Sequence, residues 1–439
     1  MDRNAEKITG VCPDASIIAK QKKEIEAAME TAMKTPVFAR ETTAYRPTLP
    51  EYAHIRAVTY DGMPYLGHKT KVFAYVGFPD GASADSPVPA VLLVHGGGGH
   101  PFLPWVKLWN DCGYAAVAME TTGYFPVTVN AGYREGSGEM YTYGLTPEFA
   151  EEGYISSPDR VFYTAYAPIE THWAYHGIGQ VILAGNLLRA DARVQADKIG
   201  ICGISWGGVT TSLAIGYDPR FAFAIPIYGT AYECGALSGF ADFSDPYVRA
   251  LWAAEDRLDR AGMPIFWLAY NDDNNFSVDS YTKSAAHTAS NPRNALAMLG
   301  SWSHSHTSAF SKQALCRAFA DYAINRPGAP GFVTFRDWPQ GREVLCHAEI
   351  PAEATNVRAR VFYITEPMTY SVHDKFGFGA YPFLDQVWQT CDDAVFADAA
   401  TGEVRGRIPD EAAGYYINIL FTLPGYGELQ SGTGYIPCR

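Results

Sequence analysis

The chain has 439 residues, of which 47% are hydrophobic and 18% are charged, and its formal net charge is -13 at pH 7. That length exceeds one ordinary core and predicts two domains, or one large domain with an appendage. The apolar fraction excludes a disordered chain, and the acidic balance without clusters of Lys and Arg excludes a nucleic-acid-binding groove.

Residues 1–36 lack a positively charged start followed by an apolar run, so no signal peptide is expected. No stretch of 18 apolar residues occurs, which excludes a membrane-spanning helix. The cysteines are scattered singly without a C-x-x-C pair, which favours reduced thiols in a cytoplasmic protein. They are Cys12, Cys112, Cys202, Cys234, Cys316, Cys346, Cys391 and Cys438.

The first elements in chain order are a surface helix and two half-buried strands. Apolar residues at helical spacing predict the helix over 15–34, within an N-terminal helical extension of residues 1–45. Alternating residues in 54–60 and 71–79 predict the strands.

Short apolar runs then alternate with helical patterns, which is typical of a parallel sheet covered by helices on both faces. The runs are 88–95, 114–120, 198–204, 221–229, 264–270 and 294–300, and the helical patterns are 102–113, 173–190, 206–217, 245–262 and 311–325. Residues 46–328 are therefore expected to form one α/β domain with a doubly wound, mostly parallel sheet. Residues 122–170 interrupt the rhythm with Gly, Tyr and Pro and predict an irregular excursion over the end of the sheet.

A Pro/Gly-rich joint at 324–332 ends the helical spacing. The remainder shows strand-length alternation and turn residues, so residues 329–439 are expected to form a small antiparallel β-sandwich.

One turn of the predicted sheet carries a nucleophile motif. Gly203, Ile204, Ser205, Trp206 and Gly207 fit G-x-S-x-G, with a buried strand before the serine and a helical pattern after it. This context forces the serine into a strained conformation above the carboxyl end of the sheet, where flanking glycines avoid collisions. We therefore interpret Ser205 as a candidate nucleophile, against the alternative of a purely structural turn.

Backbone donors for an oxyanion are expected from the "HGGGGH" run that follows the 88–95 strand. Gly97 or Gly98 would give one N–H group, and Trp206, which follows the candidate nucleophile, would give the other. A phosphate-binding loop is disfavoured because the run lacks the Walker Lys-Ser/Thr and the dinucleotide spacing. His95 is expected to be a structural hydrogen-bonding residue.

The acidic member should follow a later strand, and "YNDDNN" offers Asp272 and Asp273 after the 264–270 strand, with Asp279 further on. Asp273 is preferred, and Asp272 stays open as the alternative. The alternative to a catalytic role is that these residues only form a turn, for which Asp and Asn are well suited. A calcium loop fails because Val278 stands where the glycine belongs and no Glu occupies the twelfth position.

The base should follow the next strand, where "SHSH" provides His304 and His306. His306 is preferred because it begins the loop into the last helix, and His304 is the alternative. Zinc binding by this pair is disfavoured because no third ligand is evident. The order Ser205, Asp273, His306 is the triad order expected of this type of sheet.

At these motifs the sequence resembles the α/β-hydrolase superfamily, in its dienelactone-hydrolase and prolyl-oligopeptidase-like branch that includes acetyl xylan esterases. The resemblance covers about residues 85–325, and residues 330–439 look like the β-sandwich tail of bacterial members. It implies a Ser-His-Asp hydrolase without metal or cofactor. The doubled acid in "YNDDNN" and the doubled histidine in "SHSH" depart from the family pattern, so the register of both residues stays open.

The expected function is hydrolysis of carboxylic esters, acylated carbohydrates in particular, through an acyl-enzyme on Ser205. Aromatic side chains near the predicted mouth offer faces on which sugar rings could lie; they are Phe102, Trp105, Tyr124, Tyr133, Tyr141, Tyr143, Trp206 and Trp302. A peptidase of the same branch and a catalytically dead carbohydrate-binding or scaffold protein are the alternatives. No nucleic-acid or membrane partner is expected, and a homo-oligomer stays open.

Overall fold

The structure is a computed structural model. The residues that it describes are 14–43, 46–47, 49–97, 99–123, 168–232, 246–300, 302–374 and 380–438.

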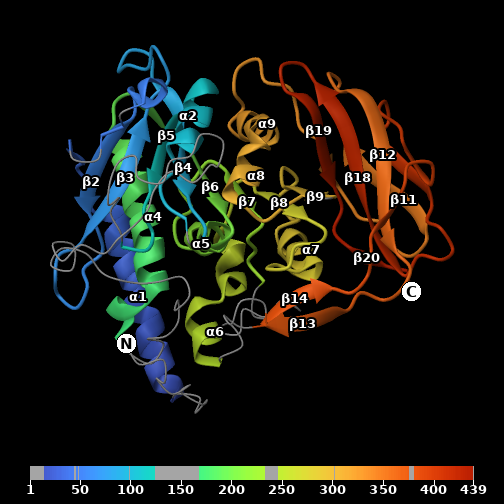
Figure 1. Cartoon of the computed structure of the whole chain (residues 1–439), viewed down its shortest axis with the longest axis horizontal. Helices are drawn as coiled ribbons and strands as arrows, with labels where there is room; N and C mark the ends of the chain where they lie inside the picture. Colours follow the sequence, from blue (N-terminus) through green and yellow to red (C-terminus); the bar gives the residue numbers. More distant parts are fainter. Residues whose placement is uncertain are drawn as a thin grey trace.

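A nine-stranded sheet forms the centre of the larger part of the molecule, in the order β1-β2-β3-β5-β4-β6-β7-β8-β9 (Figure 1). Its strands are β1 (Arg40–Glu41), β2 (Arg56–Asp61), β3 (Lys71–Gly77), β4 (Val88–Val94), β5 (Ala115–Met119), β6 (Val194–Ile204), β7 (Ala224–Ile227), β8 (Phe266–Tyr270) and β9 (Ala295–Leu299). The strands β5, β4, β6, β7, β8 and β9 run parallel to one another, whereas β1, β2 and β3 pair antiparallel, β3 with β5 at the edge of the parallel part. The predicted doubly wound, mostly parallel sheet is confirmed, and each predicted apolar run overlaps one parallel strand, of which β6 begins before its run at Val194.

Strand order reverses at β4, because β5 lies on one side of β4 and β6 on the other. Ligands of open α/β sheets bind outside the carboxyl ends of the strands at such a switch point. The glycine run follows β4, and Ser205 follows β6. Both predicted motifs therefore meet at the switch point.

Helices cover the sheet on both sides. They are α1 (Ala15–Lys34), α2 (Leu103–Asp111), α4 (Trp173–Ala190), α5 (Trp206–Ile215), α6 (Pro246–Trp252), α7 (Val278–His287), α8 (His306–Phe310) and α9 (Gln313–Ala323), with 3-10 turns η1 (Pro50–Tyr52), η3 (Ile169–Thr171) and η5 (Ala254–Arg260). One layer contains α4 and α5 with α1 packed outside them, and α2 contacts α9 in the other (Figure 1). The helical patterns in the sequence predicted these helices, except for α7 and α8.

The α7 segment differs from the prediction because its sequence, "VDSYTKSAAH", is polar at most positions. Its inner face nevertheless carries Tyr281, which is fully buried. Val278 and Ala285 lie on the same face, and tertiary packing of this narrow apolar face stabilises the helix.

The N-terminal segment is part of the main body. Ile25 and Met29 of α1 are buried, as their helical spacing predicted. β1 pairs with β2, so the chain before residue 46 also supplies the edge strand of the main sheet. The predicted excursion at 122–170 lies almost wholly outside the described residues.

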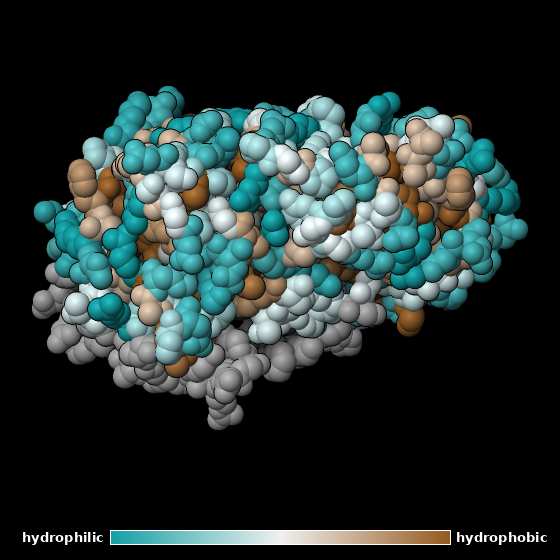
Figure 2. All heavy atoms as spheres, turned by 90° about the horizontal axis from the view of Figure 1, so that it is seen from above, coloured by the Kyte–Doolittle hydropathy of each residue, from teal (hydrophilic) through white to brown (hydrophobic). Residues whose placement is uncertain are grey.

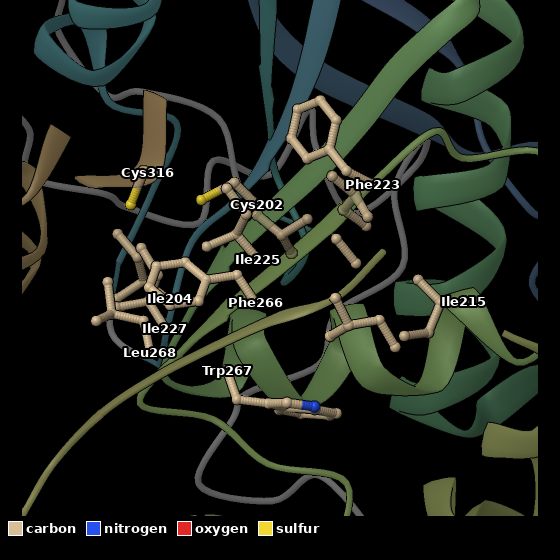
Figure 3. Packing of buried hydrophobic residues seen from close by; sticks show 14 of the residues in the cluster. Cys202, Ile204, Ile215, Phe223, Ile225, Ile227, Phe266, Trp267, Leu268 and Cys316 are labelled. Atoms are coloured by element: carbon tan, nitrogen blue, oxygen red, sulfur yellow. The ribbon is translucent and has the colours of Figure 1, made fainter. Parts of the chain in front are cut away.

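Apolar side chains fill the space beneath the carboxyl ends of the central strands. Ile204, Ile225, Ile227 and Leu268, from β6, β7 and β8, are buried and lie together in the core (Figure 3). Fully buried side chains of this size each contribute about 1.5–3 kcal/mol. The strand ends that carry the candidate site therefore rest on a rigid base.

Two antiparallel sheets follow the main body, in agreement with the predicted C-terminal all-β part. One has the order β10-β11-β17-β16 and the other β15-β12-β18-β19, with β20 also paired to β18 and a separate hairpin of β13 and β14. The strands are β10 (Thr334–Phe335), β11 (Glu343–Glu349), β12 (Thr355–Ile364), β13 (Tyr370–Asp374), β14 (Ala380–Leu384), β15 (Gln389–Cys391), β16 (Val395–Ala397), β17 (Glu403–Arg407), β18 (Gly414–Leu423), β19 (Gly427–Gly432) and β20 (Ile436–Pro437). This C-terminal part lies beside β9 and α7, and its hairpin extends back toward α6 (Figure 1).

The visible surface is largely polar. Figure 2 shows a face that is mostly hydrophilic, with apolar atoms in small separate patches. None of the helices in the described ranges is long and apolar enough to cross a membrane. The described cysteines are free thiols, and Cys12 and Cys234 lie outside the described residues.

Candidate active site

Ser205 occupies a sharp turn between β6 and α5. Its backbone angles are φ 57° and ψ -121°, and the left-handed φ is costly for a residue with a Cβ. Hydrogen bonds fix the turn: the Ser205 N–H donates to the Ile227 carbonyl at 2.9 Å, and the Gly208 N–H donates to the Ser205 carbonyl at 2.7 Å. The predicted strand-turn-helix context of the motif is therefore present.

The glycines of the motif are required by close packing. A Cβ at Gly203 would overlap the Gly207 carbonyl, and a Cβ at Gly207 would overlap the Val94 carbonyl. At Gly208 a Cβ would come within 2.8 Å of the Gly229 Cα. These approaches bring β4, β6 and β7 close enough for their loops to share one site.

His304, rather than His306, contacts the candidate nucleophile. His304 Nε2 lies 2.7 Å from Ser205 Oγ. The structure places the alternative candidate, His304, at Ser205 Oγ, and it places the preferred candidate, His306, at the glycine loop. The physical reason is that α8 begins at His306, because the Ser305 side chain accepts the Ser308 N–H and caps the helix. His304 remains in the extended loop above Ser205.

Asp273 lies on the far side of the same imidazole. His304 Nδ1 is 3.2 Å from each carboxylate oxygen of Asp273. The Asp273 side chain is 0% exposed, whereas that of His304 is 19% exposed. A carboxylate shielded from water thus faces Nδ1 and favours the tautomer with the proton on Nδ1. In this tautomer Nε2 can accept the Ser205 hydroxyl proton.

The Asp273 carboxylate is itself held by its loop. The backbone N–H of Asn275 donates to Oδ1 at 2.8 Å, and the Tyr281 hydroxyl donates to Oδ2 at 3.2 Å. Asp272 as a residue is exposed. Its carboxyl group is nevertheless partly shielded from water, and this loss of hydration, together with the charge of Asp273, raises the pKa of the group. Of the two predicted acids, Asp273 is the one in contact with the imidazole.

His306 lies against the glycine loop instead. Its Nε2 accepts the Gly96 N–H at 3.0 Å, and its ring centroid is 4.6 Å from that of Phe102. Accepting at Nε2 requires a neutral imidazole with its proton on Nδ1. Burial, with the charges of His95 and His304, lowers the pKa of His306 to about 3, so the ring stays neutral.

The glycine loop borders Ser205 directly. A Cβ at Gly96 would lie 2.8 Å from the Ser205 Cβ, and the Gly99 N–H closes a turn on the Gly96 carbonyl at 3.0 Å. Gly97 lies in this turn, and Gly98 lies outside the described residues. Trp206 is the first residue of α5, so its backbone N–H stands at the positive end of the helix dipole.

His95 supports the loop from behind. Its Nδ1 is 2.8 Å from the Gly96 carbonyl, and its Nε2 is 3.1 Å from Thr121 Oγ1 and 3.3 Å from a carboxylate oxygen of Glu120. All of these partners are buried. The contacts match the structural hydrogen-bonding role expected of this histidine.

Sequence reasoning missed Tyr228, which packs on His304. Its ring centroid is 4.5 Å from that of His304, its hydroxyl donates to the Ser305 carbonyl, and its φ is 30°. Phe276 stacks on the same imidazole with a centroid distance of 5.9 Å. A tyrosine at the end of a predicted parallel strand was the available signal for this contact.

The predicted aromatic mouth is only partly supported. Phe102 and Trp105 are buried in the core rather than open to a ligand, and Trp206 is 9% exposed. Trp302 is half-buried and packs on Tyr228 with a centroid distance of 5.1 Å, and Tyr228 also packs on His304. Tyr124, Tyr133, Tyr141 and Tyr143 lie outside the described residues.

Comparisons with known proteins found distant structural likeness. No protein-family model matches, and no curated protein matches at a significant level. An acetyl xylan esterase from Paenibacillus sp. R4 is 17% identical with a TM-score of 0.48, over 69% of this chain and 94% of that one. Acetyl Xylan Esterase 1 from Thermoanaerobacterium sp. JW/SL YS485 is 12% identical with a TM-score of 0.43, over 70% and 98%. An acylaminoacyl peptidase from Pyrococcus horikoshii is 14% identical with a TM-score of 0.46, over 62% of this chain and 42% of that one.

Proposed function

We propose that the protein is a serine hydrolase that cleaves carboxylic esters through an acyl-enzyme on Ser205. The observation that carries the proposal is the continuous contact from Ser205 Oγ through His304 to Asp273, with 2.7 Å at the first step and 3.2 Å at the second. A hydroxyl, an imidazole and a buried carboxylate in this order are the parts that nucleophilic acyl transfer needs.

In the proposed reaction, Ser205 Oγ attacks the ester carbonyl while its proton moves to His304 Nε2. The tetrahedral intermediate collapses, the ester C–O bond breaks, and the leaving alkoxide takes that proton from His304. Water then attacks the acyl-enzyme, gives a proton to His304, and the C–O bond to Ser205 breaks as Oγ recovers the proton. Asp273 keeps the Nδ1–H tautomer and stabilises the imidazolium in both halves.

The oxyanion of both tetrahedral intermediates would be stabilised by backbone amides. Trp206 and Gly97 are the proposed donors, because one follows the nucleophile at a helix start and the other lies in the turn beside it. A single donor of this kind is worth about 3 kcal/mol of transition-state stabilisation.

Acylated carbohydrates are the substrate class that we favour. Sugar rings lie well on aromatic faces, and Trp302 offers a half-buried indole on the Tyr228 side of the base. Purified protein should then hydrolyse 4-nitrophenyl acetate and acetylated glycans and leave aminoacyl anilides intact. Cleavage of the anilides alone would assign the protein to the peptidase alternative.

The central experiment is covalent labelling with a fluorophosphonate, followed by mass spectrometry of the intact protein. One adduct is expected on the wild-type chain and none on Ser205→Ala. His304→Ala should slow labelling by about 10⁴-fold or more, because the serine loses its base. His306→Gln should retain labelling, because glutamine can still accept the Gly96 N–H.

Two outcomes would overturn the proposal. Folded wild-type protein without any adduct would favour a binding or scaffold protein that keeps the fold. An adduct that survives in Ser205→Ala would place the nucleophile elsewhere.

A further inference from the structure

The loop that carries Asp273 is held at both ends by the C-terminal part of the chain. This loop, residues 271–277, joins β8 to α7. At its start, the Trp388 indole N–H donates to the Asn271 carbonyl at 2.8 Å. At its end, the Val278 N–H donates to the Tyr370 hydroxyl at 3.1 Å.

Both side chains are fixed within their own domain. Trp388 packs edge-on against Tyr416 and Tyr435, with centroid distances of 5.1 and 6.2 Å. The Tyr370 hydroxyl, besides accepting the Val278 N–H, donates to Met368 Sδ at 3.6 Å. The two side chains that reach the acid loop are thus not free to rotate away.

Further contacts join the same two parts next to the loop. The Tyr435 N–H donates to Thr282 Oγ1 in α7 at 2.8 Å, and Asn418 Nδ2 donates to the Met298 carbonyl in β9 at 2.7 Å. Figure 1 shows the C-terminal sheets along β9 and α7, and the hairpin of β13 and β14 below α7. The C-terminal part therefore contacts α7, which follows the Asp273 loop, and β9, which precedes the loop with His304.

The position of Asp273 depends on the loop ends. Its carboxylate meets Nδ1 of His304 at 3.2 Å on both oxygens, which is near the outer limit for an N–H donor. Any outward movement of Asn271 or Val278 would lengthen these contacts. A misplacement of about 1 Å at a reacting group costs about 10²-fold in rate.

We propose that the C-terminal sandwich is a positioning element of the active site, in which Trp388 and Tyr370 hold the two ends of the loop that presents Asp273. The inference rests on the proposed serine hydrolase function. Trp388 and Tyr370 are positioning residues, because they act through the Asp273 loop. The C-terminal part thus contributes to the rate of the chemistry without touching the reacting groups.

The test uses the full chain with Trp388→Phe, Tyr370→Phe and the double variant, each of which removes the polar atom and keeps an aromatic ring. Each single change is expected to reduce kcat for 4-nitrophenyl acetate and the fluorophosphonate labelling rate by about 5- to 10-fold, with KM changed less than about 2-fold. The double variant should lose about 10²-fold in both rates.

Tyr426→Phe is the matched control. Its hydroxyl also crosses from the sandwich to the main body, donating to Asp321 Oδ2 at 2.7 Å, but at α9 rather than at the acid loop. It should show wild-type kcat and labelling. An equal rate loss in Tyr426→Phe would mean that general loosening of the interface, and not the acid loop, sets the rate.

A double-mutant cycle with Asp273→Asn separates positioning from a merely structural effect. If Trp388 acts through Asp273, Trp388→Phe should change the residual rate of Asp273→Asn by less than about 2-fold. A further loss of about 5- to 10-fold in that background would overturn the inference. Wild-type rates in Trp388→Phe, Tyr370→Phe and their double variant would also overturn the positioning role. Labelling of wild-type Ser205 would in that case still support the proposed hydrolase function. Wild-type protein that is not labelled would overturn both proposals.

Discussion

Replacing the strained Ser205 by glycine should stabilise the protein relative to replacement by alanine. At φ 57° and ψ -121° a residue with a Cβ is strained, and such strain costs about 1–3 kcal/mol. Glycine adopts this conformation freely, but its greater freedom in the unfolded chain lowers the stability of the variant by about 0.4–1 kcal/mol. Loss of the partly buried methyl group of alanine lowers it by at most about 0.8 kcal/mol more. The balance is an unfolding free energy about 1 kcal/mol higher for Ser205→Gly than for Ser205→Ala.

Urea unfolding followed by tryptophan fluorescence measures this difference. Both variants lack the hydroxyl and its hydrogen bond to His304, so the pair isolates the backbone. With a slope of about 3 kcal/mol/M, the midpoint of Ser205→Gly should lie about 0.3 M above that of Ser205→Ala. Neither variant should take up a fluorophosphonate. If Ser205→Gly unfolds at the same or a lower midpoint, the turn stores no strain at Ser205 and the reasoning from its backbone angles is wrong.

Further predictions concern the acid, the turn and the buried imidazole. Asp273→Asn should lower kcat by about 10⁴-fold and Asp272→Asn by less than about 10-fold, because only the former contacts His304; equal losses in steady-state assays would contradict the assignment. Gly203→Ala should abolish soluble expression, because its Cβ would overlap backbone atoms, whereas Gly262→Ala, whose added Cβ would meet no atom within 4 Å, should express normally. The folded-state pKa of His306 is about 3, below its ordinary value, so between that value and about 6.5 the unfolded chain binds a proton that the folded chain does not. Stability should therefore fall by about 1 kcal/mol from pH 7 to pH 5.5, and His306→Gln should remove that part of the slope; an unchanged slope in urea titrations would refute it.

The sequence by itself determined the sheet and the turn that carries the candidate nucleophile, Ser205. Runs such as 198–204 are apolar at nearly every position because both faces of a parallel strand are buried, so they can be identified without knowing their neighbours. Ser205 could be identified for a similar reason. The glycines around it are required because a Cβ would overlap atoms of the same short turn or of the neighbouring strand. Constraints between residues that are close in the sequence produce a recognisable spacing of residue types.

The tertiary structure decided which residues meet across the chain. Whether His304 or His306 reaches Ser205 depends on where α8 begins, and this is set by one capping contact of Ser305. The helix α7 forms because Val278, Tyr281 and Ala285 pack inward, although most of its positions are polar. Trp388 meets Asn271 across more than a hundred residues of chain. Such contacts depend on distances between distant segments, and no spacing within a segment encodes them.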